Sequence, residues 1–260
     1  MKYIINKLKF DKVKLIFISQ WFLYIMFEAC VGNFRSYKDF FMSILPFIFF
    51  YIMAIVFLII QDIKEYLKNL NTLINICFYL IVIEQIIKVV IRFFVPYKVK
   101  IPVLHDWLYI YSIINSQGCW INSRFKLGIS LLWLDIINLI SIVLIIQMYR
   151  FYISFNNKSF WIDCTFIMMI SGAICSFIDK VFFGGSLDYI GLKGLFIIDL
   201  KDIYITLALC CFLVQFVEEN SIEECLEMSF EEDINLLKNF INYSQKDIKK
   251  LKDYVKDMMY

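Results

Sequence analysis

Six long stretches of apolar residues dominate the chain and are separated by short polar segments. A transmembrane helix needs about 20 predominantly apolar residues, and the six stretches approach or reach that length. They cover Leu15–Phe34, Phe40–Ile60, Leu73–Val95, Leu127–Met148, Phe160–Ile178 and Ile203–Val217. The pattern therefore predicts an all-α integral membrane protein with six transmembrane helices.

The segment between the third and fourth stretches, Pro96–Lys126, has a different pattern. Its residues Leu108–Ile114 are rich in Tyr and Ile and alternate with a period of two. Such alternation is typical of a β-strand rather than of a helix. We therefore expect a small extracytoplasmic β element at the outer face of the membrane.

The last segment, residues 218–260, is polar. It opens with an acidic stretch and continues as a Lys-rich helical pattern. This arrangement favours a solvated pair of helices in the cytoplasm. A docking site for a cytoplasmic partner is the alternative.

Charged residues at the start of the chain indicate its orientation. Cytoplasmic flanks of membrane helices carry an excess of Lys and Arg. The first twelve residues contain one acid, Asp11, and four lysines: Lys2, Lys7, Lys9 and Lys12. The N-terminus is therefore predicted to be cytoplasmic, and six spans return the C-terminus to the same side. The segment predicted to lie outside is also basic, which weakens this rule. A cleaved signal sequence is the alternative for the first span, but Glu28 argues against it.

Composition excludes several classes of protein. Apolar residues make up 61% of the 260 residues and charged residues only 19%, against about 25% charged in a soluble domain. A formal net charge of +2 leaves no general basic surface for nucleic acid. The single histidine, His105, excludes a multi-histidine metal site. Eight cysteines without CxxC spacing are typical of small buried apolar residues, and no metal or cofactor is expected.

Ionisable residues inside spans are costly and are candidates for function. At 1.5 Å per residue, Lys88 and Asp202 both lie roughly 22 Å from the inner membrane boundary. Asp179 ends the fifth span at about that depth, and Asp188 follows shortly after the Gly184-Gly185 turn. Three acids and a lysine are therefore predicted to converge in the outer leaflet. Asp135 and Asp163 are interpreted as structural.

Two of these acids, Asp188 and Asp202, suggest a specific chemistry. Two carboxylates at short range cannot both ionise, so they share one proton. The ionised member takes a proton from water while the protonated member polarises a peptide carbonyl, which hydrolyses the peptide without a metal. A pair of unrelated helix-end acids is the alternative that spacing leaves open.

Five segments resemble, in order and spacing, the motifs of the lipoprotein signal peptidase (signal peptidase II) family. The family's patterns are Asp-Gln-x-[Thr/Ser]-Lys, Asn-x-Gly-Ala-Ala-Phe, Gly-Gly-Ala-x-Gly-Asn-x-x-Asp-Arg, Val-Asp-[Phe/Tyr]-Ile and Phe-Asn-x-Ala-Asp. The matching segments are Ile83–Lys88, Asn115–Trp120, Ile170–Lys180, Ser186–Ile190 and Ile198–Ile205. The resemblance covers about residues 71–217 and implies four spans with the β element after the first.

The resemblance also implies residue roles and a substrate. Asp188 and Asp202 match the family's catalytic aspartates. The matching polar surroundings are Gln85, Lys88, Asn115, Gly118 and Asp179. The family cleaves the signal peptide of a prolipoprotein just before its lipid-modified cysteine, at the bacterial inner membrane. Lipidated prolipoproteins and membrane lipids are thus the expected partners.

Several positions depart from the family's pattern. Glu84 replaces aspartate, Ser176 asparagine, Lys180 arginine, Asp199 asparagine and Lys201 alanine. Ser176 is shorter than an amide and offers a single donor, so it is expected to loosen the hydrogen bonds around a catalytic carboxylate. Glu84, Ser176, Lys180 and Asp199 are nevertheless included among the supporting residues of the site.

The sequence thus predicts three parts and one leading function. Residues 1–70 are expected to form a separable two-helix membrane extension, residues 71–217 a peptidase-like core, and residues 218–260 a cytoplasmic tail. The leading hypothesis is a metal-independent intramembrane aspartyl endopeptidase. There are three alternatives. The first is an inactive scaffold of the same fold, and the second is Ser-Lys or Cys-His catalysis. The third is a transporter with a proton or ion relay of Glu28, Glu84, Lys88 and Asp135.

Overall fold

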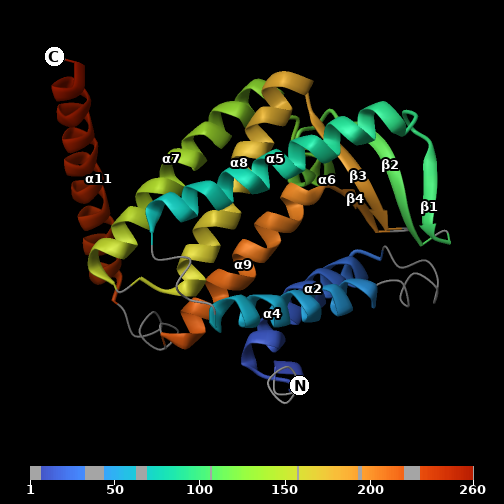
Figure 1. Cartoon of the computed structure of the whole chain (residues 1–260), viewed down its shortest axis with the longest axis horizontal. Coiled ribbons are helices and arrows are strands. Elements are labelled where there is room, and N and C mark those ends of the chain that lie inside the picture. Colours follow the sequence, from blue (N-terminus) through green and yellow to red (C-terminus); the bar gives the residue numbers. More distant parts are fainter. Residues whose placement is uncertain are drawn as a thin grey trace.

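Helices form most of the protein in its computed structural model (Figure 1). The structure describes residues 7–32, 44–62, 69–105, 107–156, 158–192, 195–219 and 229–259. These residues form eight helices and one four-stranded antiparallel sheet. Six of the helices are long and apolar enough to cross a membrane. The predicted fold class is therefore confirmed.

The six candidate spans agree with the apolar stretches to within several residues at each end. They are α2 (Lys12–Cys30), α4 (Leu45–Asp62), α5 (Leu70–Phe94), α7 (Leu131–Phe155), α8 (Phe160–Phe183) and α9 (Leu200–Glu218). Residues 33–34 and 40–43, predicted to belong to the first two spans, lie outside the described residues. The helices extend into polar flanks because charged and capping residues at the membrane boundary continue the backbone hydrogen bonding.

Local capping fixes the two helices that carry most of the site. The hydroxyl of Ser159 accepts a hydrogen bond from the backbone N–H of Ile162 at the start of α8, and the helix ends at Gly184 in the left-handed conformation. Asp199 and Asp202 form a reciprocal capping box at the start of α9. Each cap satisfies backbone groups that a helix end leaves open. The caps therefore define where the chain leaves the bundle.

Helix α8 lies at the centre of the bundle and contacts α5, α7 and α9. One apolar cluster joins α5, α7 and α8 through residues such as Leu73, Tyr149 and Ile167. A second cluster joins α2 and α4 to α8 and α9, with Phe17 and Trp161 almost fully buried. The first two spans are thus packed against the remaining four rather than standing apart from them (Figure 1).

A small sheet covers one end of the bundle (Figure 1). Its strands β1 (Lys100–Leu104), β2 (Leu108–Asn115), β3 (Ser186–Leu192) and β4 (Phe196–Ile198) pair in that order. The first two strands confirm the predicted β element, whereas β3 and β4 were not predicted. Gly185 makes the entry to β3 possible, because a Cβ at its φ of 151° would lie 2.7 Å from the carbonyl oxygen of Asn115.

The tail contains one long helix in its described part, α11 (Phe230–Met259), beside the opposite end of α7 from the sheet (Figure 1). Residues 220–228, a part of the predicted acidic stretch, lie outside the described residues. Arg150 of α7 forms a bidentate ion pair with Asp247 of α11. The tail helix is thus held to the bundle at this point.

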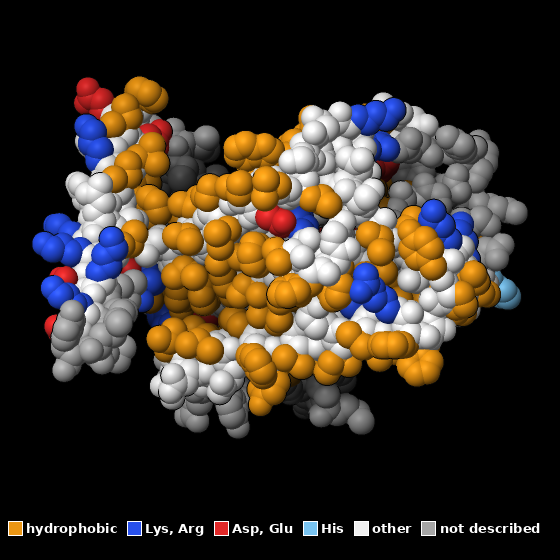
Figure 2. All heavy atoms as spheres, turned by 90° about the horizontal axis from the view of Figure 1, so that it is seen from above, with side chains coloured by type: hydrophobic (Ala, Val, Ile, Leu, Met, Phe, Trp, Pro, Cys, Tyr) orange, Lys and Arg blue, Asp and Glu red, His pale blue; other side chains and the backbone are white. Residues whose placement is uncertain are grey.

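The surface of the bundle is apolar over its spans. Figure 2 shows a broad band of hydrophobic side chains over the helices, whereas α11 presents lysines on the side that points away from the bundle. Exposed residues such as Phe78 on α5 and Leu132 and Trp133 on α7 belong to the apolar surface. Such a surface is stable in contact with lipid and not in contact with water.

Candidate active site

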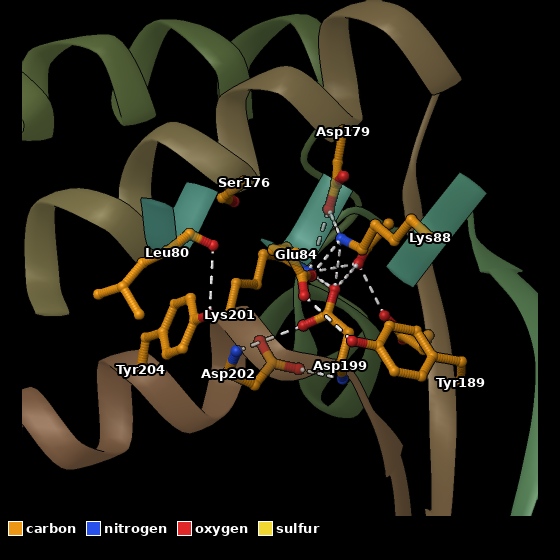
Figure 3. Close-up of polar contacts among 12 residues, drawn as sticks. Leu80, Glu84, Lys88, Ser176, Asp179, Tyr189, Asp199, Lys201, Asp202 and Tyr204 are labelled. Carbon is orange, nitrogen blue, oxygen red and sulfur yellow. Dashed lines mark hydrogen bonds and ion pairs between the residues drawn. The ribbon is translucent and has the colours of Figure 1, made fainter. Parts of the chain in front are cut away.

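Lys88 of α5 is the centre of a buried ion network (Figure 3). Its ammonium nitrogen lies 2.8 Å from the Glu84 carboxylate, 2.5 Å from Asp179 of α8 and 2.8 Å from Asp199 at the start of α9. Glu84, Asp179 and Asp199 have no exposed surface. Because burying an unpaired charge is expensive, each carboxylate needs this partner. The network therefore ties α5, α8 and α9 together at one depth.

Lys201 of α9 provides a second ammonium group to the network. It forms an ion pair with Asp199, lies 3.2 Å from Asp179 and donates a hydrogen bond of 2.5 Å to the hydroxyl of Ser186. Burial raises the pKa of Asp199, but the ammonium groups of Lys201 and Lys88 outweigh it and hold the pKa below its usual range. Asp199 is therefore ionised.

Asp188 lies on β3 beside this network. Its Oδ1 accepts a hydrogen bond of 2.7 Å from the hydroxyl of Ser186. Burial and the negative charge of Asp199 raise the pKa of Asp188 to about 6, although Lys201 and Ser186 act in the opposite direction. This carboxyl is thus able to change protonation state near neutral pH.

Asp202 faces Asp188 from the first turn of α9. Its Oδ2 accepts a hydrogen bond from the backbone N–H of Asp199 in the capping box. One carboxylate oxygen from each of Asp188, Asp199 and Asp202 lies within 4.8 Å of the others. A single water molecule is able to bridge groups at this separation.

A cavity of about 750 Å³ opens onto both acids. Its polar end contains Asp188, Asp202, Lys201 and Ser176, and the rest of its lining is mostly apolar and aromatic. A smaller cavity of about 530 Å³ also reaches Asp188 and is lined partly by Asn115 and Gln117. Ligand sites commonly combine an apolar wall with a few converging polar groups.

The sequence of this protein matches the model of a known protein family. The sequence model described as Signal peptidase (SPase) II matches residues 76–218, more than half of the chain. The protein belongs to the signal peptidase II family. No curated protein sequence matches the chain. Two solved structures described as bacterial membrane enzymes are similar, at 20% and 19% identity and TM-scores of 0.49 and 0.47. The alignments cover 58% and 56% of this chain and 91% and 93% of theirs.

Membership of the signal peptidase II family, together with six apolar helices, makes this a multi-pass membrane protein of an aspartic peptidase family. The geometry also explains two departures from the family's pattern. Asp199 and Lys201 bind each other and Ser186 in the buried network. A charge at only one of these positions would stay partly uncompensated, so the two replacements form a single change.

Three other predicted residues have clear positions around the acids. Asn115 ends β2 opposite Ser186 and contributes to both cavities. Gly118 lines the larger cavity with a φ of 73°, and a Cβ there would lie 2.8 Å from the side chain of Leu131. Gln85 lies on α5, where its buried Nε2 has no hydrogen-bond partner, and it joins none of the described ion pairs.

Ser176 and Lys180 of α8 contact each other instead of the acids. The ammonium group of Lys180 lies 2.5 Å from the Ser176 hydroxyl, so this hydroxyl contacts the ammonium rather than a carboxylate. Ser176 nevertheless lines the larger cavity. The expected loosening of a hydrogen bond to a catalytic carboxylate therefore has no counterpart among the described contacts.

Sequence reasoning missed two members of the network, Ser186 and Tyr189. Ser186 connects Lys201 to Asp188, and the Tyr189 hydroxyl donates a hydrogen bond of 3.0 Å to Glu84. Burial and the charges of Glu84 and Asp199 raise the pKa of Tyr189, which keeps the phenol neutral. Both residues flank Asp188 in the matched segment, and that adjacency was the available signal.

The three acids also have the composition of a site for a hard cation. The ammonium group of Lys201 already pairs with Asp199, and that of Lys88 lies 2.8 Å from the same carboxylate. Positive charge is therefore supplied by this chain's own side chains at the position where an ion would bind Asp199.

Proposed function

We propose that this protein is an active lipoprotein signal peptidase that cleaves lipid-modified prolipoproteins before the lipidated cysteine, with Asp188 and Asp202 as its catalytic pair. One observation carries the proposal. The two carboxylates lie within 4.8 Å of each other at the polar end of a large, mostly apolar cavity. A membrane-embedded peptide with an attached lipid needs both features.

The chemistry follows from one proton shared by the pair. The ionised carboxylate takes a proton from a water molecule while the oxygen of that water attacks the scissile carbonyl carbon. The protonated carboxyl donates its proton to the carbonyl oxygen, which gives a neutral tetrahedral intermediate. On collapse of this intermediate the C–N bond breaks, and the first acid returns its proton to the leaving amine. The second acid takes the proton of one hydroxyl group as the carbonyl re-forms, which restores the starting protonation of the pair.

The test is to replace each acid by its amide in the full chain. Asp188→Asn and Asp202→Asn are each expected to lower the cleavage rate of a diacylglyceryl-modified precursor by at least about 100-fold, because an amide cannot transfer the proton. Asp163→Asn is the matched control, since Asp163 is a buried acid that binds Tyr149 instead of this network. Wild-type cleavage by either site variant would contradict the proposal, and an inactive wild type would favour the scaffold alternative.

We also propose that the reaction needs no metal. Lys88 and Lys201 supply the positive charge beside the acids, and the acid pair activates water directly. Incubation with a strong chelator is therefore expected to leave the cleavage rate unchanged. Inhibition by the chelator that added zinc reverses would overturn this part of the proposal.

The proposed reaction also needs an orientation. We propose that both termini are cytoplasmic and that the sheet and acid pair lie on the outer side of the bacterial inner membrane. The lysines near the N-terminus support this orientation. Labelling of a cysteine introduced at exposed Lys100 by an impermeant reagent added to intact spheroplasts tests it, with Lys250→Cys as the inside control.

A further inference from the structure

Helices α2 and α4 close one side of the cavity that contains Asp188 and Asp202. Trp21 and Tyr24 of α2 and Phe49 and Phe50 of α4 line this cavity. Strands of the sheet and α9 contribute further lining residues. The two N-terminal helices precede the segment matched by the signal peptidase II family, so this wall is an addition to the family's core.

Aromatic contacts hold the wall against the sheet. The Trp21 ring lies 4.9 Å from the Tyr24 ring and 5.6 Å from the Phe196 ring of β4, measured between centroids. Tyr24 also lies 5.5 Å from Phe196. Edge-to-face and stacked rings at these separations stabilise an apolar surface without adding polar groups. The cavity thus has an apolar, aromatic lining where α2 meets β4.

An ion pair fastens the same helix to the core. Glu28 of α2 lies 3.2 Å from Arg124 of α6 (Trp120–Phe125). Helix α6 begins at Trp120, the last residue of the Asn115–Trp120 motif, and Trp120 lines the cavity. Both ends of the wall, α2 at Glu28 and the Phe17–Trp161 contact deeper in the bundle, are therefore anchored to the core.

The lining of the cavity indicates what occupies it. Most of its residues are apolar or aromatic. A hydrocarbon chain is narrow, flexible and apolar, and it matches the aromatic lining.

We propose that α2 and α4 form a wall of the substrate site, and that the apolar end of this cavity binds a fatty acyl chain with a length limit set by Phe49 and Trp21. This inference rests on the function proposed above and specifies the part of the substrate that the added helices recognise. The chain's source is the lipid-modified cysteine of the substrate, whose reacting peptide bond then lies at Asp188 and Asp202.

Photocrosslinking tests the location directly. A diacylglyceryl-cysteine lipopeptide with a diazirine at the end of one acyl chain is added to the full-length Asp188→Asn variant in phosphatidylcholine vesicles. We expect labelled peptides from α2 or α4, and an unlabelled lipopeptide should compete for them. In a second arm, a phospholipid carries the same diazirine. Two results would overturn the proposal. One is that the phospholipid labels α2 and α4 as strongly as the lipopeptide does and the unlabelled lipopeptide does not compete. The other is that the lipopeptide labels only other helices.

Chain-length preference tests the wall's function. Phe49 is 37% exposed, so Phe49→Ala should fold, and it should raise the ratio of kcat/KM for a long-chain over a short-chain lipopeptide about tenfold or more. Trp21→Phe should change the ratio in the same direction. The matched control is Phe22→Ala, since Phe22 is an exposed α2 residue outside the cavity lining.

The two proposals fail in different ways. An unchanged ratio in Phe49→Ala and Trp21→Phe, with normal cleavage by the wild type, would overturn the acyl-chain wall and leave the peptidase function standing. A wild type that cleaves neither lipopeptide would overturn the function. The competed crosslink on α2 or α4 would still support acyl-chain binding by the wall.

Discussion

Asp199 and Lys201 replace two uncharged residues of the signal peptidase II pattern with a buried ion pair next to the proposed catalytic acids. Their charges act in opposite directions on Asp188, because Asp199 raises the pKa of that carboxyl and Lys201 lowers it. The pKa of about 6 is thus a balance between two added charges and burial. This balance sets the pH above which the acid pair loses its shared proton.

The pH profile of cleavage tests this balance. If Asp188 must carry the shared proton, kcat/KM falls as pH rises through about 6. Lys201→Ala removes the charge that lowers the pKa, so the fall should move to higher pH by roughly one unit. Asp199→Asn removes a charge that raises it, so the fall should move to lower pH.

The double variant, Lys201→Ala with Asp199→Asn, controls for damage to the fold. It should return the fall close to the wild-type pH, because opposite charges are removed together and neither is left buried alone. Identical pH profiles in all four proteins would contradict a role for this ion pair in setting the protonation of Asp188.

Individual site residues were predictable to different degrees. Asp188, Asp202 and Lys88 were identified because acids and lysines inside or beside apolar spans are rare and their depths coincide. The contact of Ser186 with both Lys201 and Asp188 was not predictable. It depends on the register of β3 against β2 and on side-chain rotamers, neither of which leaves a periodic pattern in the sequence.

At the scale of elements, β3 shows why a strand was missed next to the motif that contains it. Nearly every residue of Ser186–Leu192 is buried, on both faces. The segment therefore lacks the polar and apolar alternation by which a half-exposed strand is recognised. By contrast, β2 keeps enough alternation to be predicted, and long apolar runs predicted all six spans.

The tail helix α11 provides a prediction at the same scale. Arg150 donates two hydrogen bonds to Asp247, and these bonds hold the pKa of the Asp247 carboxyl below its usual range. Gln147 and Tyr243 add further contacts between α7 and α11. The ion pair thus stabilises docking at neutral pH, and this contribution is lost as pH falls through the lowered pKa.

Asp247→Asn should loosen α11 from α7 by about 1 kcal/mol, or roughly fivefold in the docking equilibrium, since Arg150 is partly exposed. Distances between spin labels on exposed positions of α7 and α11 measure this change. The wild type should show the same broadening only in acid. Asp253→Asn, on the exposed side of α11, is the control, and an unchanged distance distribution for Asp247→Asn would show that apolar contacts alone hold the helix.

At the scale of the whole molecule, the first two spans are an addition to the four-span core of the family. The sequence suggested that residues 1–70 are a separable extension, and that boundary stays a prediction. The packing gives the extension a second role. Phe17 and Phe57 of the added helices contact Trp161 of the core, and the same helices line the cavity.

Deletion of residues 1–69 separates these roles. The deletion removes an even number of spans, so the core should insert with its orientation unchanged. The rate of cleavage of a lipidated precursor should nevertheless fall at least about tenfold. Without the wall formed by α2 and α4, the substrate is held less well against the acid pair. The measurement is kcat/KM beside labelling of a cysteine introduced at Lys100. Supplying residues 1–69 as a separate chain should restore part of the rate. Full activity of the correctly oriented core alone would instead establish that the acid pair and its four helices suffice.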